Sequence, residues 1–427
     1  MIRIVTQWAT TLFRAAAQQH SALFKNSGAL TIGTGTAAIL GFIYWWVAAR
    51  SFSPEVIGTA SAFISLIGFI GLIGECGIGT LLTGEIVQQR LEHSHGLISA
   101  AVIASLLLSL AFGGIALALS GIASGTTLRP RGFDYFWVLI GCGLSGLSLV
   151  VDKTFVGMLQ AGFQMLRQFL FSTVKLGLVV LVALWMSSDT AILISWVAGM
   201  AASLILVELF MRRTGQSFIY RPDFKLLYTL RRKAAHHYML DVSAHAPILI
   251  MPYLVAVMLS PAANAVFTVT WMVVVISSII PGALSAVLFP AIQAAPEEYR
   301  AKMVLSLGAS LLFSLLVGLS IYFYSDKLLE VFNPAYEKIG DSHLRFLGFG
   351  VIGHAIKSHV GTAARLNDRM RVASLWFSLT SLFELACVTV GCLIGGLEGL
   401  SVGWTSALLI DGVVMLSLTN PLIRMVK

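Results

Sequence analysis

The sequence predicts an all-α polytopic membrane protein whose twelve transmembrane helices form two six-helix bundles, related by a pseudo-two-fold axis along the membrane normal. Three observations support this fold class: a shortage of charged residues, the spacing of long uncharged segments, and a repeat between the two halves. Of the 427 residues, 57% are hydrophobic and 11% are charged, whereas a soluble domain has about 25% charged residues. This composition argues against a soluble enzyme, a nucleic-acid-binding domain and a disordered scaffold.

Uncharged segments place the membrane spans, because crossing ~30 Å of hydrocarbon takes ~20 predominantly apolar residues. Residues 242–296 carry no formal charge and would make ~80 Å of helix, so Ser260-Pro261 is predicted to divide them into two spans. The first six spans are predicted at about 26–49, 56–74, 93–128, 134–155, 169–187 and 190–210, and the second six at about 242–259, 261–296, 302–324, 343–362, 371–394 and 397–421.

The spans divide the chain into four segments. Residues 1–27 carry basic side chains around apolar ones without a long apolar run, which is typical of an amphipathic helix lying on the membrane surface. An N-terminal six-helix lobe is then predicted over 28–210 and a C-terminal six-helix lobe over 238–427. Between them, residues 211–237 form a basic linker with seven Lys and Arg residues.

The distribution of positive charge predicts the orientation. If both termini and the linker are cytoplasmic, the cytoplasmic segments hold nineteen Lys and Arg residues and the outer loops hold five. Cytoplasmic loops of membrane proteins carry an excess of Lys and Arg. The sequence therefore predicts a multi-pass protein with both ends in the cytoplasm.

The two halves repeat one another, which also predicts the symmetry. Lys153-Thr154-Phe155-Val156-Gly157 closes the fourth span and Lys357-Ser358-His359-Val360-Gly361 closes the tenth, 204 residues later. An arginine follows ten residues after each glycine, and Ser-Pro follows both the first and the seventh spans. Parallel repeats of this kind are found in transporters that bind substrate between two lobes and rock them to alternate access.

Two short motifs resemble a known family. Ala48-Ala49-Arg50-Ser51-Phe52-Ser53-Pro54-Glu55-Val56-Ile57-Gly58 looks like the first outer loop of the polysaccharide transporter branch of the multidrug/oligosaccharidyl-lipid/polysaccharide exporter superfamily. Glu75-Cys76-Gly77-Ile78-Gly79-Thr80 is similar to the acid-x-Gly-x-Gly-Thr end of its second span, with Glu75 where Asp is commoner. The likeness in spans and halves extends over the whole chain.

This resemblance implies a flippase rather than an enzyme, without a cofactor or a metal. Family members move polyprenyl-pyrophosphate-linked oligosaccharides, such as O-antigen units, across the bacterial inner membrane. The expected partners are the lipid-linked oligosaccharide, membrane lipids and a coupling proton or sodium ion. Whether the chain works alone or beside a glycosyltransferase and a polymerase stays open at this stage.

Three lysines at membrane depth are the candidates for binding the pyrophosphate. Ionisable groups at this depth usually face a cavity or a partner, and Lys153, Lys357 and Lys175 could hold a dense anion in a low-dielectric site. The repeat relates Lys153 to Lys357, whereas Lys175 has Leu379 at the corresponding position. The alternative is that each lysine stem snorkels to the cytoplasmic interface.

Histidines and carboxylates supply further candidates. His354 lies three residues before Lys357, so both share a helical face; it is a substrate candidate or a histidine hydrogen-bonded to the backbone. Asp241 and His245 are one turn apart and could carry a coupling proton, although Asp241 could instead be an N-terminal helix residue favoured by the helix dipole.

The remaining polar and glycine positions in the spans are predicted to be structural. Glu384 and Asp411 are the deepest acids, and a hydrogen bond between the last two spans is the simpler interpretation of both. Gly77 and Gly79 are expected on a helix, where small residues favour helix packing.

Two other functions fit the sequence less well than a flippase. A drug or organic-cation antiporter of the same superfamily would need carboxylates facing its cavity, yet residues 28–49 hold no acidic residue. A membrane enzyme acting on lipid-linked sugars would need a sizeable outer loop with catalytic groups, and the longest one predicted here, about 325–342, holds no histidine. The sequence therefore favours the flippase, with the antiporter as the alternative.

Overall fold

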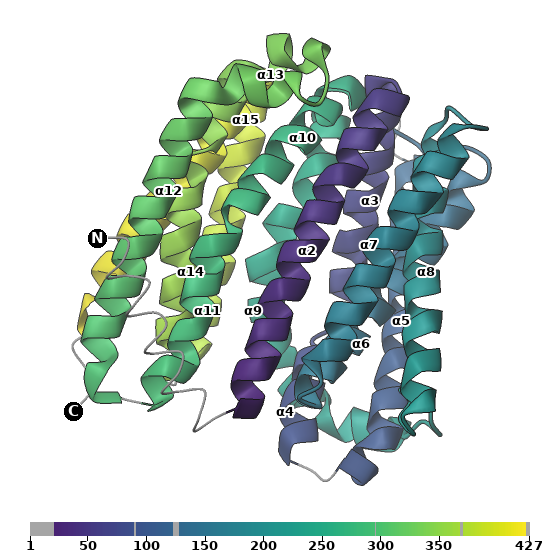
Figure 1. The fold of residues 1–427 in the computed structure, drawn as a ribbon, viewed down its shortest axis with the longest axis vertical. Coiled ribbons are helices and arrows are strands. Elements are labelled where there is room, and N and C mark those ends of the chain that lie inside the picture. The colour runs from purple at the N-terminus through teal and green to yellow at the C-terminus, as the bar shows by residue number, and fades with distance from the viewer. Residues whose placement is uncertain (1–20, 89–90, 123–127, 295, 368–369, 424–427) are drawn as a thin grey trace.

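The computed structural model describes residues 21–88, 91–122, 128–294, 296–367 and 370–423, and within these ranges the secondary structure is helical, with no strand. The helices lie side by side, with most of the N-terminal half of the chain on one side of the view and most of the C-terminal half on the other (Figure 1). Nine segments within the described ranges are long and apolar enough to cross a membrane. The predicted helical membrane fold is confirmed.

In the part of the chain that the structure describes, the N-terminal lobe contains seven helices that make six spans, because α3 and α4 together form one span. A short break separates these two helices, where Cys76 and Gly77 have positive φ angles of 51° and 71°. The helices are α2 (Ser21–Ser51), α3 (Pro54–Glu75), α4 (Ile78–Gln88), α5 (Leu91–Ile122), α6 (Asp134–Gly157), α7 (Ala161–Ala183) and α8 (Asp189–Arg213).

The C-terminal lobe also makes six spans. Two of its spans are interrupted, between α10 and α11 and between α13 and α14. The elements are α9 (Phe224–Met258), α10 (Pro261–Ser277), α11 (Ile279–Ala294), the 3₁₀ turn η1 (Pro296–Glu298), α12 (Tyr299–Glu330), α13 (Pro334–Leu347), α14 (Gly350–Leu366) and α15 (Met370–Ile423).

Helix α15 holds the last two spans, which turn back on each other at Gly395 and Gly396. Both glycines have non-helical backbone angles, and Gly396 has a φ of 58°. A Cβ atom added at Gly391 would lie 2.1 Å from the carbonyl oxygen of Gly399. The two halves are therefore packed backbone to backbone, and the predicted boundary between residues 394 and 397 is confirmed.

The connection between the lobes is shorter than the predicted linker at 211–237. Helix α8 continues to Arg213 and α9 begins at Phe224, so that only residues 214–223 are non-helical. Asp223 caps α9, since its side chain accepts a hydrogen bond from the Leu226 amide at 2.9 Å. The basic residues after position 223 therefore extend the seventh span toward its N-terminus. Of the predicted surface helix 1–27, residues 1–20 lie outside the described residues, and α2 begins at Ser21.

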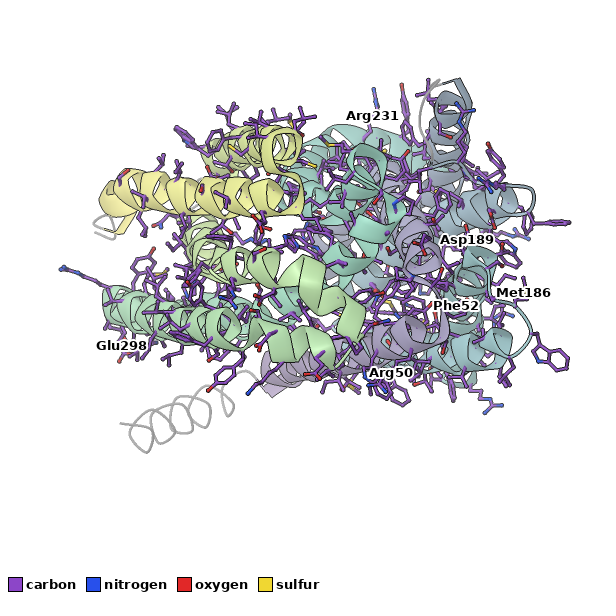
Figure 2. The ribbon with its side chains drawn as sticks, turned by 90° about the horizontal axis from the view of Figure 1, so that it is seen from above. Arg50, Phe52, Met186, Asp189, Arg231 and Glu298 are labelled. Atoms are coloured by element: carbon purple, nitrogen blue, oxygen red, sulfur yellow. The ribbon has the colours of Figure 1, made fainter. Side chains whose placement is uncertain are left out.

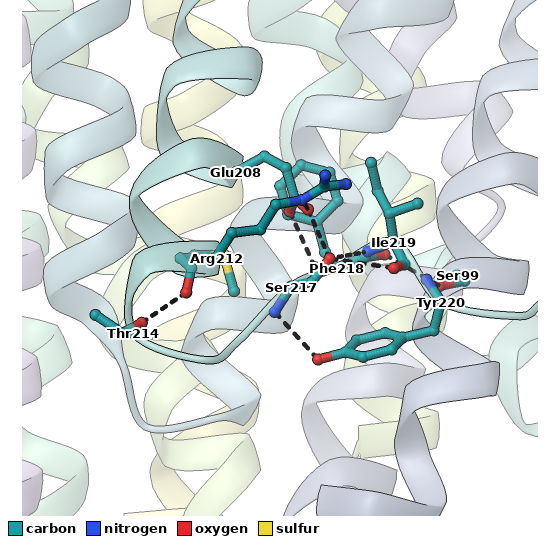
Figure 3. A network of polar contacts seen from close by, with 9 residues as sticks. Ser99, Glu208, Arg212, Thr214, Ser217, Phe218, Ile219 and Tyr220 are labelled. Carbon is teal, nitrogen blue, oxygen red and sulfur yellow. Dashed lines mark hydrogen bonds and ion pairs between the residues drawn. The ribbon is translucent and has the colours of Figure 1, made fainter.

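Polar contacts fasten this connection to the N-terminal lobe (Figure 3). Glu208 on α8 accepts hydrogen bonds from the Ser217 hydroxyl at 2.6 Å and from the Phe218 amide at 3.1 Å. Ser99 on α5 donates to the Phe218 carbonyl at 3.1 Å and accepts from the Tyr220 amide at 2.6 Å. Residues 217–220 are thus attached to α5 and α8 before the chain enters α9.

The upper ends of the lobes in Figure 1 are joined by a polar and close-packed contact between α3 and α10. Each helix begins with a capping serine followed by proline at the first position: Ser53 accepts from the Val56 amide and Ser260 from the Ala263 amide, an arrangement favoured at helix starts. A Cβ atom at Gly58 would lie 1.6 Å from the Pro261 carbonyl oxygen. The backbones of the two lobes therefore touch here.

Residues of α2 reinforce this upper junction from one side. Trp46 Nε1 and Arg50 Nη2 donate to the Val331 carbonyl at 3.0 and 3.1 Å. Seen from above, Arg50 lies at the end of α2, and the connection between α7 and α8, which contains Met186, is at the far edge of the N-terminal lobe (Figure 2). One continuous cluster of buried apolar residues, which includes Tyr44, Ile57 and Phe267, takes members from both lobes.

Candidate functional site

Lys153 on α6 lies at a junction of three helices. Its Nζ atom is 2.8 Å from Oδ2 of Asp241 on α9 and 2.5 Å from Oγ1 of Thr80 on α4. The Thr80 hydroxyl also donates to Asp241. The Lys153 side chain is 35% exposed, so this ion pair between α6 and α9 is open to one side.

Glu75 adds a second carboxylate beside Lys153. Its two oxygens accept from the Gly77 amide at 3.0 Å and the Gly79 amide at 2.6 Å, and the carboxylate interacts electrostatically with Lys153 and Asp241. A Cβ atom at Gly79 would lie 2.6 Å from Glu75 Oε1 and 3.0 Å from Lys153 Cβ. A glycine is therefore needed here for the carboxylate and the lysine to approach α4.

The expected place of Gly77 on a continuous helix is wrong. Gly77 sits in the break between α3 and α4, with its amide turned to Glu75. The αL conformation at this position favours glycine, and a carboxylate at the N-terminus of α4 is stabilised by the free amides and the helix dipole. The acid-x-Gly-x-Gly-Thr motif thus builds a polar turn that ends at Thr80.

Lys357 on α14 has a comparable but more buried environment. Its Nζ atom donates to Oε1 of Glu384 on α15, and the side chains are only 10% and 4% exposed. Asp411, on the second half of α15, interacts with both Glu384 and Lys357. The simpler interpretation of the two acids, a hydrogen bond between the last two spans, omitted Lys357, which is ion-paired with Glu384.

The two repeat-related lysines therefore have similar surroundings. Each lies beside two carboxyl groups, Glu75 and Asp241 for Lys153, and Glu384 and Asp411 for Lys357. That these lysines bind a pyrophosphate stays a prediction, and in the structure both are ion-paired within the protein. Each amine is directed at a carboxylate, Asp241 for Lys153 and Glu384 for Lys357.

Lys175 lies inside the N-terminal lobe, between α2, α7 and α8. Its residue is 4% exposed, and its Nζ atom lies 3.8 Å from the ring centre of Trp196, 4.4 Å from that of Phe171 and 5.1 Å from that of Tyr44. A cation over aromatic faces is stabilised by the ring quadrupoles. The structure does not bring Lys175 together with Lys153 or Lys357.

His245 and His354 each lie one helical turn from a charged residue of a lysine site, Asp241 and Lys357 respectively. His245 on α9 is exposed, and its Nδ1 lies 2.9 Å from the Asp241 carbonyl oxygen. His354 on α14 is partly buried and interacts electrostatically with Lys357 and with His245. Asp241 is far inside α9, which begins at Phe224, so the alternative that it stabilises a helix N-terminus is wrong.

Sequence reasoning missed one strong ion pair next to the site. Asp152 accepts from Arg167 through both of its oxygens, with Nε 2.5 Å from Oδ1. The nineteen Lys and Arg residues of the predicted cytoplasmic segments include Arg167, but this residue lies within α7 and is 6% exposed. The 15-residue separation of the pair gives no helical spacing from which the contact could be read.

No group of three or more metal-ligating side chains occurs within the described part of the chain.

Comparison with known proteins places the chain in a family. The model of the family described as polysaccharide biosynthesis protein matches residues 23–295, which is more than half of the sequence. The chain belongs to this family. No curated protein matches the chain.

Solved structures share the fold at low sequence identity. The inward-facing conformation of a multidrug resistance MATE family transporter of the MOP superfamily is 15% identical, with a TM-score of 0.70 over 91% of this chain and 94% of that chain. A MATE structure in complex with MaL6 is 14% identical, with a TM-score of 0.67 over 94% and 96%. The outward-facing conformation of a multidrug resistance MATE family transporter is 15% identical, with a TM-score of 0.64 over 94% of this chain and 96% of that chain. This polysaccharide biosynthesis family member therefore has the two-lobed, twelve-helix fold of these transporters.

Proposed function

We propose that the protein is a flippase that moves a polyprenyl-pyrophosphate-linked oligosaccharide across the bacterial inner membrane by alternating access. The observation that carries the proposal is the position of Lys153. This lysine is a partly exposed cation on α6 of the N-terminal lobe. It contacts α4 of the same lobe and α9, the first helix of the C-terminal lobe. The membership in a polysaccharide biosynthesis family supports the cargo class.

The chemistry of binding is an exchange of anions at the lysine. A pyrophosphate oxygen can replace Asp241 as the acceptor of the Lys153 ammonium, since both are charge-assisted acceptors. In the present arrangement Asp241 and Thr80 occupy the amine. The cargo headgroup therefore competes with the Asp241 carboxylate for Lys153. Binding of the headgroup breaks the Lys153–Asp241 ion pair between the lobes.

Asp241 and His245 are proposed to carry the coupling step, with a proton or a sodium ion as the coupling ion. Release of Lys153 leaves Asp241 without its cation at a site that is about 85% covered, since its side chain is 15% exposed. A buried carboxylate that loses its partner favours the uptake of a proton or another cation. His245 lies one helical turn away on the exposed side.

The alternative is a drug or organic-cation antiporter, as the fold of the MATE structures suggests. Such a transporter needs a carboxylate free to meet a cation. In the described residues the acids beside the junction are committed to Lys153 and to amides of α4. This commitment favours an anionic headgroup over a cationic drug.

Complementation of a flippase-deficient strain, with expression checked by immunoblot, tests the proposal. Lys153→Arg should restore glycan export, whereas Lys153→Ala and the double variant with Lys357→Ala should not. Lys225→Ala, at an exposed position of α9, is the matched control and should complement fully. Full complementation by the double alanine variant at normal protein levels contradicts the proposed role. Resistance to organic cations conferred by the wild-type protein, without glycan export, supports the antiporter.

A further inference from the structure

Two prolines interrupt the backbone hydrogen bonding of α9 shortly after Asp241. Pro247 and Pro252 both lie inside this helix. A proline has no amide hydrogen, so the carbonyl group four residues before it loses its helical donor. For Pro247 this carbonyl belongs to Ser243, two residues after Asp241. A backbone carbonyl at membrane depth needs another donor from the protein, because the hydrocarbon supplies none.

A serine of α15 supplies the missing donor. The Ser381 hydroxyl donates to the Ser243 carbonyl, the group that Pro247 leaves without an amide. The Ser243 hydroxyl lies 2.7 Å from that of Ser378, one turn earlier on α15. Ser243 and Ser381 are 8% and 5% exposed, so these bonds form inside the protein. Helices α9 and α15 are therefore joined by two hydrogen bonds at the proline break.

A serine of the other lobe contacts α9 at its second proline. Ser65 on α3 donates to the Leu249 carbonyl and accepts from the Tyr253 amide at 3.3 Å. These two backbone groups would bond to each other in a regular helical turn, and Pro252 lies between them in the sequence. Each lobe thus contributes a hydroxyl to the interrupted part of α9, Ser381 from the C-terminal lobe and Ser65 from the N-terminal lobe.

Asp241 lies in the part of α9 that is held from both lobes. Before it, leucines in the first two turns of the helix pack against buried apolar residues of α4, α5 and α6. Asp241 itself is joined to the N-terminal lobe by its ion pair with Lys153. Just after it, the hydrogen bonds at Ser243 join the same segment to α15. The position of Asp241 opposite Lys153 therefore depends on the attachment at Ser243.

We propose that Ser381 is a positioning residue for the Lys153–Asp241 junction. By replacing the amide that Pro247 lacks, its hydroxyl fixes the part of α9 that carries Asp241. Ser381 acts through the backbone of α9 rather than on the cargo. Its part in transport rests on the proposed function of the junction, whereas the replacement of the hydrogen bond does not depend on what the protein carries.

The reactivity of Lys153 in the purified full-length protein in lipid nanodiscs tests this role. The amine is paired with Asp241 and the side chain is 35% exposed, so the rate at which an amine-modifying reagent labels it, measured by mass spectrometry, reports how firmly the pair is held. Ser381→Ala should raise this rate about two- to tenfold, the factor that one hydrogen bond is worth. Ser381→Thr keeps the hydroxyl and should react like the wild-type protein. Ser203→Ala, which removes a buried hydroxyl that bonds within α8, is the matched control and should do the same.

The proline provides a decisive second comparison. Pro247→Ala restores an amide that can donate to the Ser243 carbonyl, so adding Ser381→Ala in that background should leave the labelling of Lys153 nearly unchanged. Should Ser381→Ala alone fail to fold, the double variant still decides, because the proposal requires it to fold and to react like Pro247→Ala. Labelling that is unchanged in Ser381→Ala, or that rises equally with and without Pro247, overturns the proposal.

Glycan export separates this inference from the proposed function. Export should fall in Ser381→Ala and be restored in Ser381→Thr. If the wild-type protein exports no glycan, the proposed function fails while faster labelling in Ser381→Ala still supports the positioning role. If export requires Lys153 but labelling is the same in Ser381→Ala and the wild-type protein, the positioning role alone fails.

Discussion

Ser61 on α3 and Thr268 on α10 occupy equivalent positions in the two repeats and are hydrogen-bonded to each other, with 2.9 Å between their hydroxyl oxygens. Their separation of 207 residues equals that of the capping serines Ser53 and Ser260. Two equivalent residues can touch only where they both approach the pseudo-two-fold axis. This contact therefore marks the axis at the upper junction of the lobes, where Asn264 also donates to the Gly58 carbonyl at 2.8 Å.

A disulfide between these two positions should lock the upper junction. In a background from which the four native cysteines are removed, Ser61→Cys with Thr268→Cys should oxidise to a crosslink, because the replaced hydroxyls are in contact. Transport should stop on oxidation and return on reduction, if the lobes must separate here in each cycle. Each single cysteine variant serves as the control. Unchanged transport by the fully crosslinked protein would contradict the movement of this junction.

The orientation in the membrane gives a second prediction. The predicted excess of Lys and Arg on one side places the connection at 214–223 in the cytoplasm. In the same cysteine-free background, a membrane-impermeant thiol reagent added outside cells should miss Gln216→Cys and label Lys338→Cys. Permeabilised cells should label both, which controls for accessibility. The opposite pattern in intact cells would reverse the topology.

The sequence predicted the spans well because each one is long, apolar and bounded by charge. The prediction from charge failed where a charged side chain is buried with its partner, since Arg167 lies inside α7 and is ion-paired with Asp152. It also failed at Gly77, where the turn depends on the carboxylate of Glu75 rather than on hydropathy. The candidate lysines and acids were found from their depth, but the pairing of Lys357 with Glu384 joins α14 to α15 across 27 residues. Such contacts arise from tertiary packing that hydropathy does not encode.

The Arg167–Asp152 pair should contribute a large part of the free energy of unfolding of the N-terminal lobe. Removing one partner of a buried ion pair costs about 3–5 kcal/mol, and we expect about 3 kcal/mol for Arg167→Ala, because the Asp152 side chain is still 14% exposed. The thermal transition in detergent should fall accordingly. The double variant with Asp152→Ala should recover most of the loss. A double variant as unstable as Arg167→Ala would show that packing, rather than charge, is responsible.

Transport should depend on an ion gradient. The proposed function assigns a coupling ion to Asp241 and His245, beside the Lys153 junction. Flipping in reconstituted vesicles should therefore fall when the proton and sodium gradients are both collapsed. Collapsing each gradient alone identifies the ion. Flipping that continues at the same rate without either gradient would make the protein a facilitator.

Asp241→Asn and Lys153→Ala should change the binding of a pyrophosphate in opposite directions. Lys153→Ala removes the cation, and the loss of charge-assisted hydrogen bonds of ~1.5–3 kcal/mol should weaken binding roughly ten- to hundredfold. Asp241→Asn removes the internal competitor for the same ammonium, so binding should tighten while transport falls. Binding is measured with a fluorescent polyprenyl pyrophosphate on purified protein.

Thr80→Val separates these electrostatic effects from simple disturbance of the junction. It removes the hydroxyl that contacts both Lys153 and Asp241 but leaves their charges in place. Binding should change far less than in either charged variant. If Asp241→Asn weakened binding as strongly as Lys153→Ala, the carboxylate would be part of the binding site rather than its competitor. The exchange of Asp241 for pyrophosphate at Lys153 would then be wrong.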